Sequence, residues 1–281
     1  MNAYQAIHSV LADALMNRDT HILGEALELS PATRGLHAIN PDRVHLLPAA
    51  DASLVGVAIG LAMTGARAVM ELSGPDALWG VVQQLGQEAA PLRQVGEFVA
   101  PVVIRVPLAP TQQAPLDLIS GINGLVIGAA STATEAVGLV SGALESLDPV
   151  VLFEHREVLC EPVEDLIQPV GFGQARVTRE GQDATVITWG TGVSLAHRIA
   201  DTLVSEGIEI EIVDLRTIQP TDSQTIGNSV HKTGRPILLG CPLSVFDTTI
   251  QTAFERLESP PTRIVTTESA LITALNQAID Y

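Results

Sequence analysis

Residues 211–235 read EIVDLRTIQPTDSQTIGNSVHKTGR, and this stretch decides the fold class. The apolar run that ends at Asp214 predicts a strand over 209–214, and the spacing of 223–231 predicts a helix after it. A second apolar run, 236–239, follows within a few residues and predicts the next strand. A strand, a helix and a strand in this order are typical of parallel sheets covered by helices, so the sequence predicts an α/β protein.

The same alternation of apolar runs and helical patterns extends along almost the whole chain. It predicts two domains, each a mostly parallel sheet flanked by helices. The expected strands are 21–24, 44–47, 68–72, 101–106, 124–128, 149–153, 185–189, 209–214, 236–239 and 262–265. The expected helices are 3–17, 52–64, 76–90, 132–147, 194–205, 223–231, 246–257 and 269–279.

A break in composition separates the two halves of the chain. The break falls at 154–168, where the stretch HREVLCEPVEDLIQP (155–169) is charged, holds two prolines and shows no clean period. We therefore predict a first domain over 1–155, a linker over 156–170 and a second domain over 171–281. The length of 281 residues agrees with two domains, since a domain commonly takes about 100–200 residues.

The composition argues against several classes of partner. The chain has 32 acidic residues against 15 Lys and Arg, a net charge of −17. Such a field repels phosphate backbones and anionic lipid surfaces, so we expect no nucleic acid and no membrane as partner. The apolar stretch 54–70 is interrupted by glycines and an arginine, and it is too short to span a bilayer comfortably.

The two cysteines, Cys160 and Cys241, are isolated in the sequence and form no CxxC pair. They make no disulfide framework, and we expect both to be reduced, buried thiols. The N-terminus shows no basic start followed by an apolar run, so no signal peptide is expected. Together these features predict a cytoplasmic protein.

Several segments resemble the beta subunit of thiamine diphosphate-dependent 2-oxo acid dehydrogenases and, more distantly, transketolase. The stretch 211–235 is the most specific, because Asp214-Leu-Arg216-Thr, Pro220, Asp222 and Lys232-Thr-Gly-Arg235 keep the family's spacing. The resemblance implies a transketolase-like pyrimidine-binding domain followed by a transketolase C-terminal-like domain. The other matching segments are ILGEAL (22–27), NPDRVHLLPAADASLVGVAIGLAMTGARAVMEL (40–72), PVVIRVP (101–107), DPVVLFEHREV (148–158) and VITWGTGVSLAHRIADTL (186–203).

The resemblance also implies partners. An alpha-type subunit of a heterotetramer would supply the diphosphate site, with magnesium held by a Gly-Asp-Gly motif. This chain contains no Gly-Asp-Gly and no GxxxxGK[ST] loop, so a partner must hold the charged end of thiamine diphosphate. The small-residue helix 52–64 favours close helix contact, and we expect at least self-association as a dimer.

Asp51 is the expected catalytic residue. The resemblance implies an acid just after a proline, at the start of a helix, that hydrogen-bonds a pyrimidine nitrogen and promotes the imino form. Asp51 follows Pro48 there and is one methylene shorter than the family's Glu, and a displacement near an ångström costs about 100-fold in rate. The alternative interpretation is that Asp51 is only the N-cap of its helix.

Two further family positions fall on Glu25 and Ala77. Glu25 follows a strand and matches an acid that contributes to subunit contacts and proton relay around the cofactor, or it is a solvated loop acid. The aromatic on which the pyrimidine stacks falls on Ala77 in an ungapped count, and a preceding aromatic falls on Gly74. Trp79, two residues beyond Ala77, is expected to be an ordinary core or interface aromatic.

The family's loop histidine has no counterpart. No His occurs between His45 and His155, and the loop 107–115 after the central strand is shorter than the family's. Two functions therefore stay open. The chain is a beta-type subunit that carries out oxidative decarboxylation of a 2-oxo acid with an alpha partner, or it is a catalytically inactive paralogue with a structural or interaction role.

Three other patterns allow weaker predictions. Gly190-Thr-Gly192 between a strand and a helix suggests dinucleotide binding, although Leu195 stands where a third small residue belongs. Arg105 ends an apolar strand, where it meets an anion or, as is commoner, forms a buried ion pair. The histidines do not have zinc-ligand spacing, so no metal site is expected.

Overall fold

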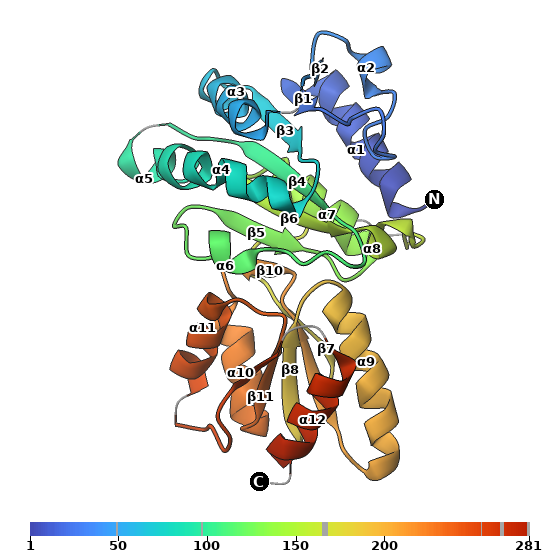
Figure 1. Cartoon of the computed structure of the whole chain (residues 1–281), viewed down its shortest axis with the longest axis vertical. Coiled ribbons are helices and arrows are strands. Elements are labelled where there is room, and N and C mark those ends of the chain that lie inside the picture. Colours follow the sequence, from blue (N-terminus) through green and yellow to red (C-terminus); the bar gives the residue numbers. More distant parts are fainter. Residues whose placement is uncertain (49, 97, 165–167, 254, 265–266, 280–281) are drawn as a thin grey trace. The chain divides into compact units, whose positions relative to one another are not determined.

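The computed structural model describes residues 1–48, 50–96, 98–164, 168–253, 255–264 and 267–279. These residues group into two compact units, Met1–Gly171 and Phe172–Tyr281 (Figure 1). Each unit is built on a mostly parallel sheet with helices around it, so the predicted α/β fold class is confirmed. Within the described residues, no helix is both long enough and apolar enough to cross a membrane.

The sheet of the first unit consists of parallel pairs throughout its described registers. Its strands are almost completely buried and rich in Val, Ile and Ala, as expected when helices cover both faces. The strand order is β5-β6-β4-β3-β1-β2. The bounds are β1 Thr20–Gly24, β2 Val44–Leu46, β3 Arg67–Glu71, β4 Val102–Leu108, β5 Val126–Ala129 and β6 Val150–His155.

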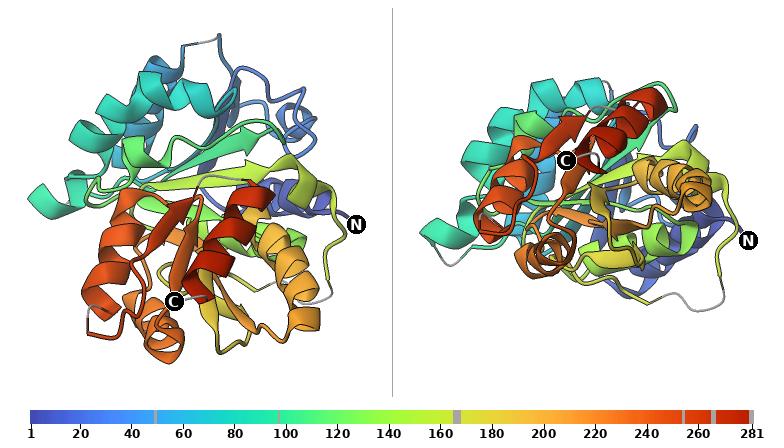
Figure 2. Two further views of the ribbon diagram at one scale, coloured as in Figure 1. Left: turned by 60° about the horizontal axis from the view of Figure 1, so that its bottom comes forward. Right: turned by 90° about the horizontal axis from the view of Figure 1, so that it is seen from below.

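Helices form a layer on each side of this sheet (Figure 1, Figure 2). One layer contains α1 (Ala3–Asn17), α7 (Ala133–Ala143) and α8 (Arg156–Cys160), which contact one another. The other contains α3 (Asp51–Met63) and α4 (Leu78–Gln84), which also pack together. Shorter elements are α2 (Leu36–Ile39), η1 (Pro75–Ala77), η2 (Leu85–Ala89), α5 (Leu92–Val95) and α6 (Leu116–Ile119).

The segment 156–170 belongs to the first unit in its described part, although the sequence predicted a linker there. Helix α8 begins directly after β6 and contacts α1 and α7. Farther on, the N–H of Val170 donates to the carbonyl of Gly138 at 3.0 Å. A Cβ on Gly142 would lie 2.6 Å from the carbonyl oxygen of Val170, so two glycines of α7 give this segment its place.

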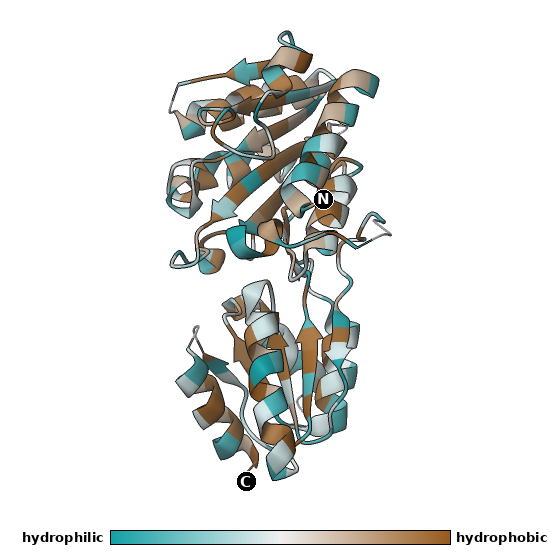
Figure 3. Cartoon of the chain, turned by 90° about the vertical axis from the view of Figure 1, so that its right-hand side faces the viewer, coloured by the Kyte–Doolittle hydropathy of each residue, from teal (hydrophilic) through white to brown (hydrophobic). Residues whose placement is uncertain are grey.

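The second unit is a five-stranded sheet in the order β12-β11-β8-β9-β7, with β7 the one antiparallel strand of its described pairs. Helices α9 and α12 contact each other, and α10 and α11 do the same. Figure 3 shows the strands as hydrophobic bands between helices with polar outer faces. The bounds are β7 Arg176–Arg179, β8 Ala184–Thr188, α9 Thr191–Leu203, η3 Val204–Glu206, β9 Ile210–Asp214, β10 Thr217–Gln219, α10 Ser223–Thr233, β11 Pro236–Leu239, α11 Leu243–Ala253, β12 Thr262–Ile264 and α12 Glu268–Ile279.

The stretch 211–235 holds its own loop together. The main-chain N–H of Arg216 donates to Oδ1 of Asp214 at 3.1 Å, and Arg216 takes a positive φ of 51°. Asp222 is the N-cap of α10, because its Oδ1 accepts from the N–H of Thr225 at 3.0 Å. Its Oδ2 also accepts from the N–H of Ala175 at 2.9 Å, which fastens the start of the unit to this helix.

Two local expectations are wrong. The predicted helix 76–90 is broken into η1, α4 and the π-helical turn η2, and Gly80 and Gly86 lower the helix propensity of this stretch. Cys241 is buried as expected, and burial raises the pKa of its thiol. Cys160 is exposed, because it ends the short surface helix α8.

Candidate active site

The three residues selected from the sequence lie at one edge of the first sheet. Glu25 directly follows β1, Asp51 begins α3 after β2, and Ala77 ends η1 after β3. Strand β1 pairs in parallel with both β2 and β3, so the carboxyl ends of the three strands share an edge. Ligands of open α/β sheets bind at the carboxyl ends of the strands, which makes this edge the candidate site.

Asp51 is half-buried at the first position of α3. Burial and then the charge of Glu25 raise the pKa of the Asp51 carboxyl, so the two acids lie within electrostatic reach. Ala50 is the N-cap of α3, and the Asp51 side chain makes no hydrogen bond to any described residue. The alternative interpretation of Asp51 as the helix cap is therefore wrong.

The stacking position contains no aromatic ring. Ala77 is half-buried at the end of η1, and Gly74 before it is buried with an extended backbone. Trp79 leaves 67% of its surface exposed on α4. It is therefore not a core residue, and its role in an interface stays a prediction.

Arg105 forms a buried ion pair on both sides, the commoner of the two outcomes expected for it. Its Nη1 lies 2.6 Å from Oε2 of Glu71, and its Nε and Nη2 lie 2.8 and 2.7 Å from the two carboxylate oxygens of Glu154. All three side chains are at most 9% exposed. Burial raises the pKa of Glu71, while its contact with Arg105 opposes that shift. This triad connects β3, β4 and β6 through Arg105 of β4 and the carboxylates near the carboxyl ends of β3 and β6.

The loop after β4 contains a polar side chain that sequence reasoning missed. The Nε2 atom of Gln112 lies 3.8 Å from the position that a Cβ on Gly74 would take. The Oε1 atom of the same side chain accepts from the N–H of Ala109 at 3.0 Å. The available sequence signal was the loop itself, 107–115, which contains two glutamines and no charged residue.

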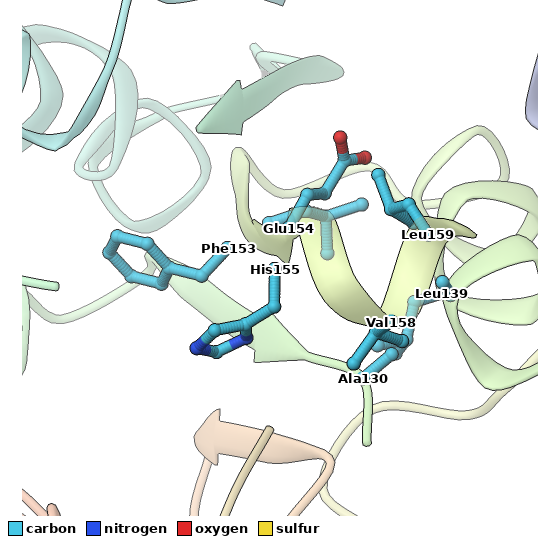
Figure 4. Close-up of a pocket in the computed structure, with 9 residues that line it drawn as sticks. Ala130, Leu139, Phe153, Glu154, His155, Val158 and Leu159 are labelled. Atoms are coloured by element: carbon cyan, nitrogen blue, oxygen red, sulfur yellow. The ribbon is translucent and has the colours of Figure 1, made fainter. Parts of the chain in front are cut away.

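A small pocket lies beside the end of β6 (Figure 4). Glu154 and His155 leave the strand in different directions there, and Val158 and Leu159 of α8 form another wall. The cavity volume is about 10 Å³, room for at most about one water molecule and far below the roughly 300–1,000 Å³ of small-molecule sites. Burial lowers the pKa of His155 to about 4, so its neutral form is favoured. The pocket therefore does not resemble a cofactor site.

His21 and His45 form a second titratable cluster. Nδ1 of His21 lies 2.9 Å from Nε2 of His45, and Oδ1 of Asp19 lies 3.6 Å from the other ring nitrogen of His21. The pKa of His45 is lowered by burial and then by His21 and His37. Among the described residues, no group of three or more His, Cys, Asp or Glu is placed to hold a metal ion.

The glycines of the turn 190–192 have a packing role. A Cβ on Gly192 would lie 2.2 Å from Oγ1 of Thr188, so α9 approaches β8 closely. The hydroxyl of Thr188 donates to the carbonyl of Leu239 at 3.0 Å, and Nε1 of Trp189 donates to the carbonyl of Gly240 at 2.8 Å. These bonds connect the residues before the turn to β11. The close approach explains Gly192, and a positive φ of 54° explains Gly190, without a dinucleotide.

Comparisons with known proteins cover most of the chain. The family described as transketolase, C-terminal domain matches residues 173–271. The chain is 31% identical to the pyruvate dehydrogenase E1 component subunit beta of Staphylococcus epidermidis, over 96% of this chain and 90% of that protein. It is 34% identical to the 2-oxoisovalerate dehydrogenase subunit beta of Bacillus subtilis, over 80% of this chain and 74% of that protein. It is 36% identical to the acetoin:2,6-dichlorophenolindophenol oxidoreductase subunit beta of Cupriavidus necator, over 74% of this chain and 64% of that protein.

Solved structures agree in fold. A structure described as "Split gene transketolase, inactive beta4 tetramer" matches with a TM-score of 0.81 at 19% identity, over 100% of this chain and 98% of that one. The relatives above are beta subunits of dehydrogenases that use thiamine diphosphate, and two of them are at least 30% identical over more than two thirds of their own length. The chain therefore belongs to the family of beta subunits of thiamine diphosphate-dependent 2-oxo acid dehydrogenases.

Proposed function

We propose that this chain is the beta-type subunit of an enzyme that oxidatively decarboxylates a 2-oxo acid, with Asp51 against the pyrimidine ring of thiamine diphosphate. The observation that carries the proposal is the half-buried Asp51 carboxyl at the carboxyl edge of the sheet, which bonds to no described residue. A buried polar group without a partner is costly, so a ligand atom that hydrogen-bonds it is favoured there. The dehydrogenase relatives support this choice of ligand.

We assign to Asp51 the exchange of a proton with a pyrimidine nitrogen of the bound coenzyme. Burial and then the charge of Glu25 raise the pKa of the Asp51 carboxyl, which makes it easier to protonate than an ordinary Asp. A protonated carboxyl donates one hydrogen bond and still accepts others, which suits exchange of a proton with a ring nitrogen. Bound thiamine diphosphate supplies the electron sink that decarboxylation needs.

The charged end of the coenzyme requires a partner chain. The described residues offer no cluster for a metal ion, and the sequence has no phosphate-binding loop. We therefore assign the diphosphate and its magnesium ion to an alpha-type subunit. Because Asp51 opens α3, that subunit must contact the chain close to the start of this helix.

The outer face of α3 is suited to such a contact. Gly56, Gly60 and Met63 recur at helical spacing on one exposed side, and Val57 lies next to them with 48% of its surface exposed. A Cβ on either glycine would meet no atom within 4 Å, so another helix can approach the backbone closely. Helix α4 packs beside α3 (Figure 1) and carries Trp79, another exposed large hydrophobic residue. We propose that the alpha-type subunit docks on this outer face of α3.

Reconstitution with an alpha-type chain that carries a diphosphate motif tests the function. The complex should bind thiamine diphosphate saturably in the presence of magnesium, as measured by calorimetry. It should also decarboxylate pyruvate or a branched 2-oxo acid. Asp51→Asn keeps the size of the side chain but removes its acid, and we expect turnover to fall by about 100-fold or more.

Asp42→Asn is the matched control, since Asp42 is exposed on the loop before β2. This variant should keep wild-type turnover. A reconstituted complex that binds no thiamine diphosphate would contradict the proposed function, and full activity of Asp51→Asn would contradict the role of Asp51. Self-association of the chain is measured in the same preparations by sedimentation, where at least a dimer is expected.

A further inference from the structure

Gln112 and Gly74 lie beside each other at the candidate site. Strand β3 ends at Glu71, which pairs with Arg105, and the parallel strand β4 continues for three more residues to Leu108. The segments that follow the two strands therefore leave the same edge of the sheet. Gly74 follows β3, and Gln112 follows β4 by four residues. If Gly74 carried a Cβ atom, Nε2 of Gln112 would lie 3.8 Å from it.

The Gln112 side chain is held in one orientation by its own loop. The N–H of Ala109 donates to Oε1 of Gln112 at 3.0 Å, and the N–H of Gln112 donates to the carbonyl of Ala109 at 2.9 Å. Because an N–H must meet the oxygen of the amide, the NH₂ group faces away from Ala109. The residue is exposed, so this NH₂ group can present hydrogen-bond donors to a ligand at the edge of the sheet.

The charges around the edge leave few other donors for an anion. Glu25 and Asp51 are acids, and the guanidinium of Arg105 is buried and fully engaged by two carboxylates. The loop 107–115 contains no cationic residue and no His. A 2-oxo acid offers only acceptor oxygens, on its carboxylate and its carbonyl group. The oriented NH₂ group of Gln112 is a hydrogen-bond donor in the described part of this loop, and it can bind these acceptor oxygens.

We propose that Gln112 binds the 2-oxo acid substrate by donating its Nε2 hydrogens to the substrate carboxylate. This inference rests on the proposed function and adds to it the residue that orients the substrate. Gly74 has a part in the arrangement, since the missing side chain leaves the space in which the amide lies. With φ of 163°, Gly74 is extended and other residues can adopt its backbone. A side chain at position 74 would therefore fill the space beside Gln112 and leave the backbone conformation unchanged.

Gln112→Glu is the sharpest test. This substitution retains an oxygen that can accept from Ala109, while the outward NH₂ group becomes a second acceptor that repels a carboxylate. Gln112→Ala removes the donor altogether. Gly74→Val leaves Gln112 in the sequence but adds a side chain in the space beside its amide. Thr111→Ala, at an exposed neighbour in the same loop, is the matched control.

The measurements use the complex reconstituted with the alpha-type chain. KM for pyruvate should rise about 10-fold to 100-fold in Gln112→Ala, because a hydrogen bond to a charged group is lost. It should rise further in Gln112→Glu, and Gly74→Val should also raise it. The Kd of methyl acetylphosphonate, a pyruvate analogue, should weaken in parallel in calorimetry. kcat should stay within about threefold of wild type, as expected for a residue that contributes to substrate binding alone.

The control readout is the affinity for thiamine diphosphate, which should stay within about twofold in all four variants. If thiamine diphosphate binds and pyruvate turns over, but Gln112→Ala and Gln112→Glu keep the wild-type KM, then this inference is wrong and the proposed function stands. If the wild-type complex binds no thiamine diphosphate, both fail. A loss of coenzyme affinity in Gln112→Glu equal to the rise in KM would also overturn the assignment to substrate.

Discussion

Arg105 on β4 holds Glu154 on β6 through two parallel contacts, Nε to Oε1 at 2.8 Å and Nη2 to Oε2 at 2.7 Å. The same guanidinium reaches Glu71 on β3, so one buried cation neutralises carboxylates from the strands on either side. A paired geometry of this kind satisfies the planar donors of arginine. The consequence is that a single buried side chain connects three neighbouring strands.

Arg105→Met should therefore destabilise the first unit strongly. Removing the cation leaves two carboxylates buried side by side, and breaking a buried ion pair in this way costs about 3–5 kcal/mol. The measurement is the free energy of unfolding in urea. The matched control is Arg198→Met, which removes an exposed pair with Glu268 at 3.5 Å. It should cost less than about 1 kcal/mol. Equal losses in the two variants would contradict the buried character of the triad.

The triad also shows where sequence reasoning ends. The side chains that meet Arg105 lie 34 and 49 positions away in the chain, and only the pairing of β3, β4 and β6 brings them together. Gln112 and Gly74 are brought together in the same way, by the parallel pairing of β3 and β4. A pattern in one stretch of sequence holds no information about such neighbours. Asp51 could be selected in advance because its family position is defined by the local segment that begins at Pro48.

Secondary structure was predictable where the local signals agree. Helix α1 has the predicted bounds Ala3–Asn17, since its apolar period is reinforced by a capping box between Asn2 and Gln5. Helix α8 was missed because five residues are too few to show a period, and its packing against α1 and α7 stabilises it instead.

Two glycines on different helices should respond in opposite directions to alanine. Gly142→Ala in α7 places a Cβ 2.6 Å from the carbonyl of Val170 and should destabilise the chain by about 1–3 kcal/mol. Gly60→Ala in α3 meets no atom within 4 Å and should stabilise the isolated chain by about 0.5–1 kcal/mol through helix propensity. Thermal or urea unfolding of the isolated chain separates the two. If Gly142→Ala were neutral, the segment around Val170 would not be packed on α7.

A larger side chain on α3 also tests where the alpha-type subunit binds. Gly60→Leu leaves the isolated chain folded, because the position is open, but it should weaken association with the alpha-type subunit. Sedimentation of the mixture measures this loss. Unchanged association would show that the partner does not dock on α3.

His155 should make the stability of the chain depend on pH. Its pKa falls from an ordinary 6.5 to about 4 through burial, so the unfolded chain binds a proton more readily than the folded chain. Stability from this group is complete above pH 6.5 and is lost as the pH falls toward 4, by about 3 kcal/mol in all. His155→Gln cannot titrate, so it should lose less stability than wild type between pH 8 and pH 4.5. Urea unfolding at both values measures the difference, and parallel losses would contradict the shift.

Glu25→Gln should lower the pKa of Asp51. Burial, the larger cause of the raised value, is unchanged by this substitution, but the neighbouring negative charge is removed. The Asp51 carboxyl should then titrate at lower pH than in wild type and still above the ordinary value for Asp. NMR titration of the Asp51 carboxyl carbon in the isolated chain measures this directly, without need of coenzyme or partner. Glu88→Gln, an exposed acid on η2, is the control and should leave the titration in place. A wild-type titration curve in Glu25→Gln would show that the two acids do not interact, and Glu25 would then lose its place in the candidate site.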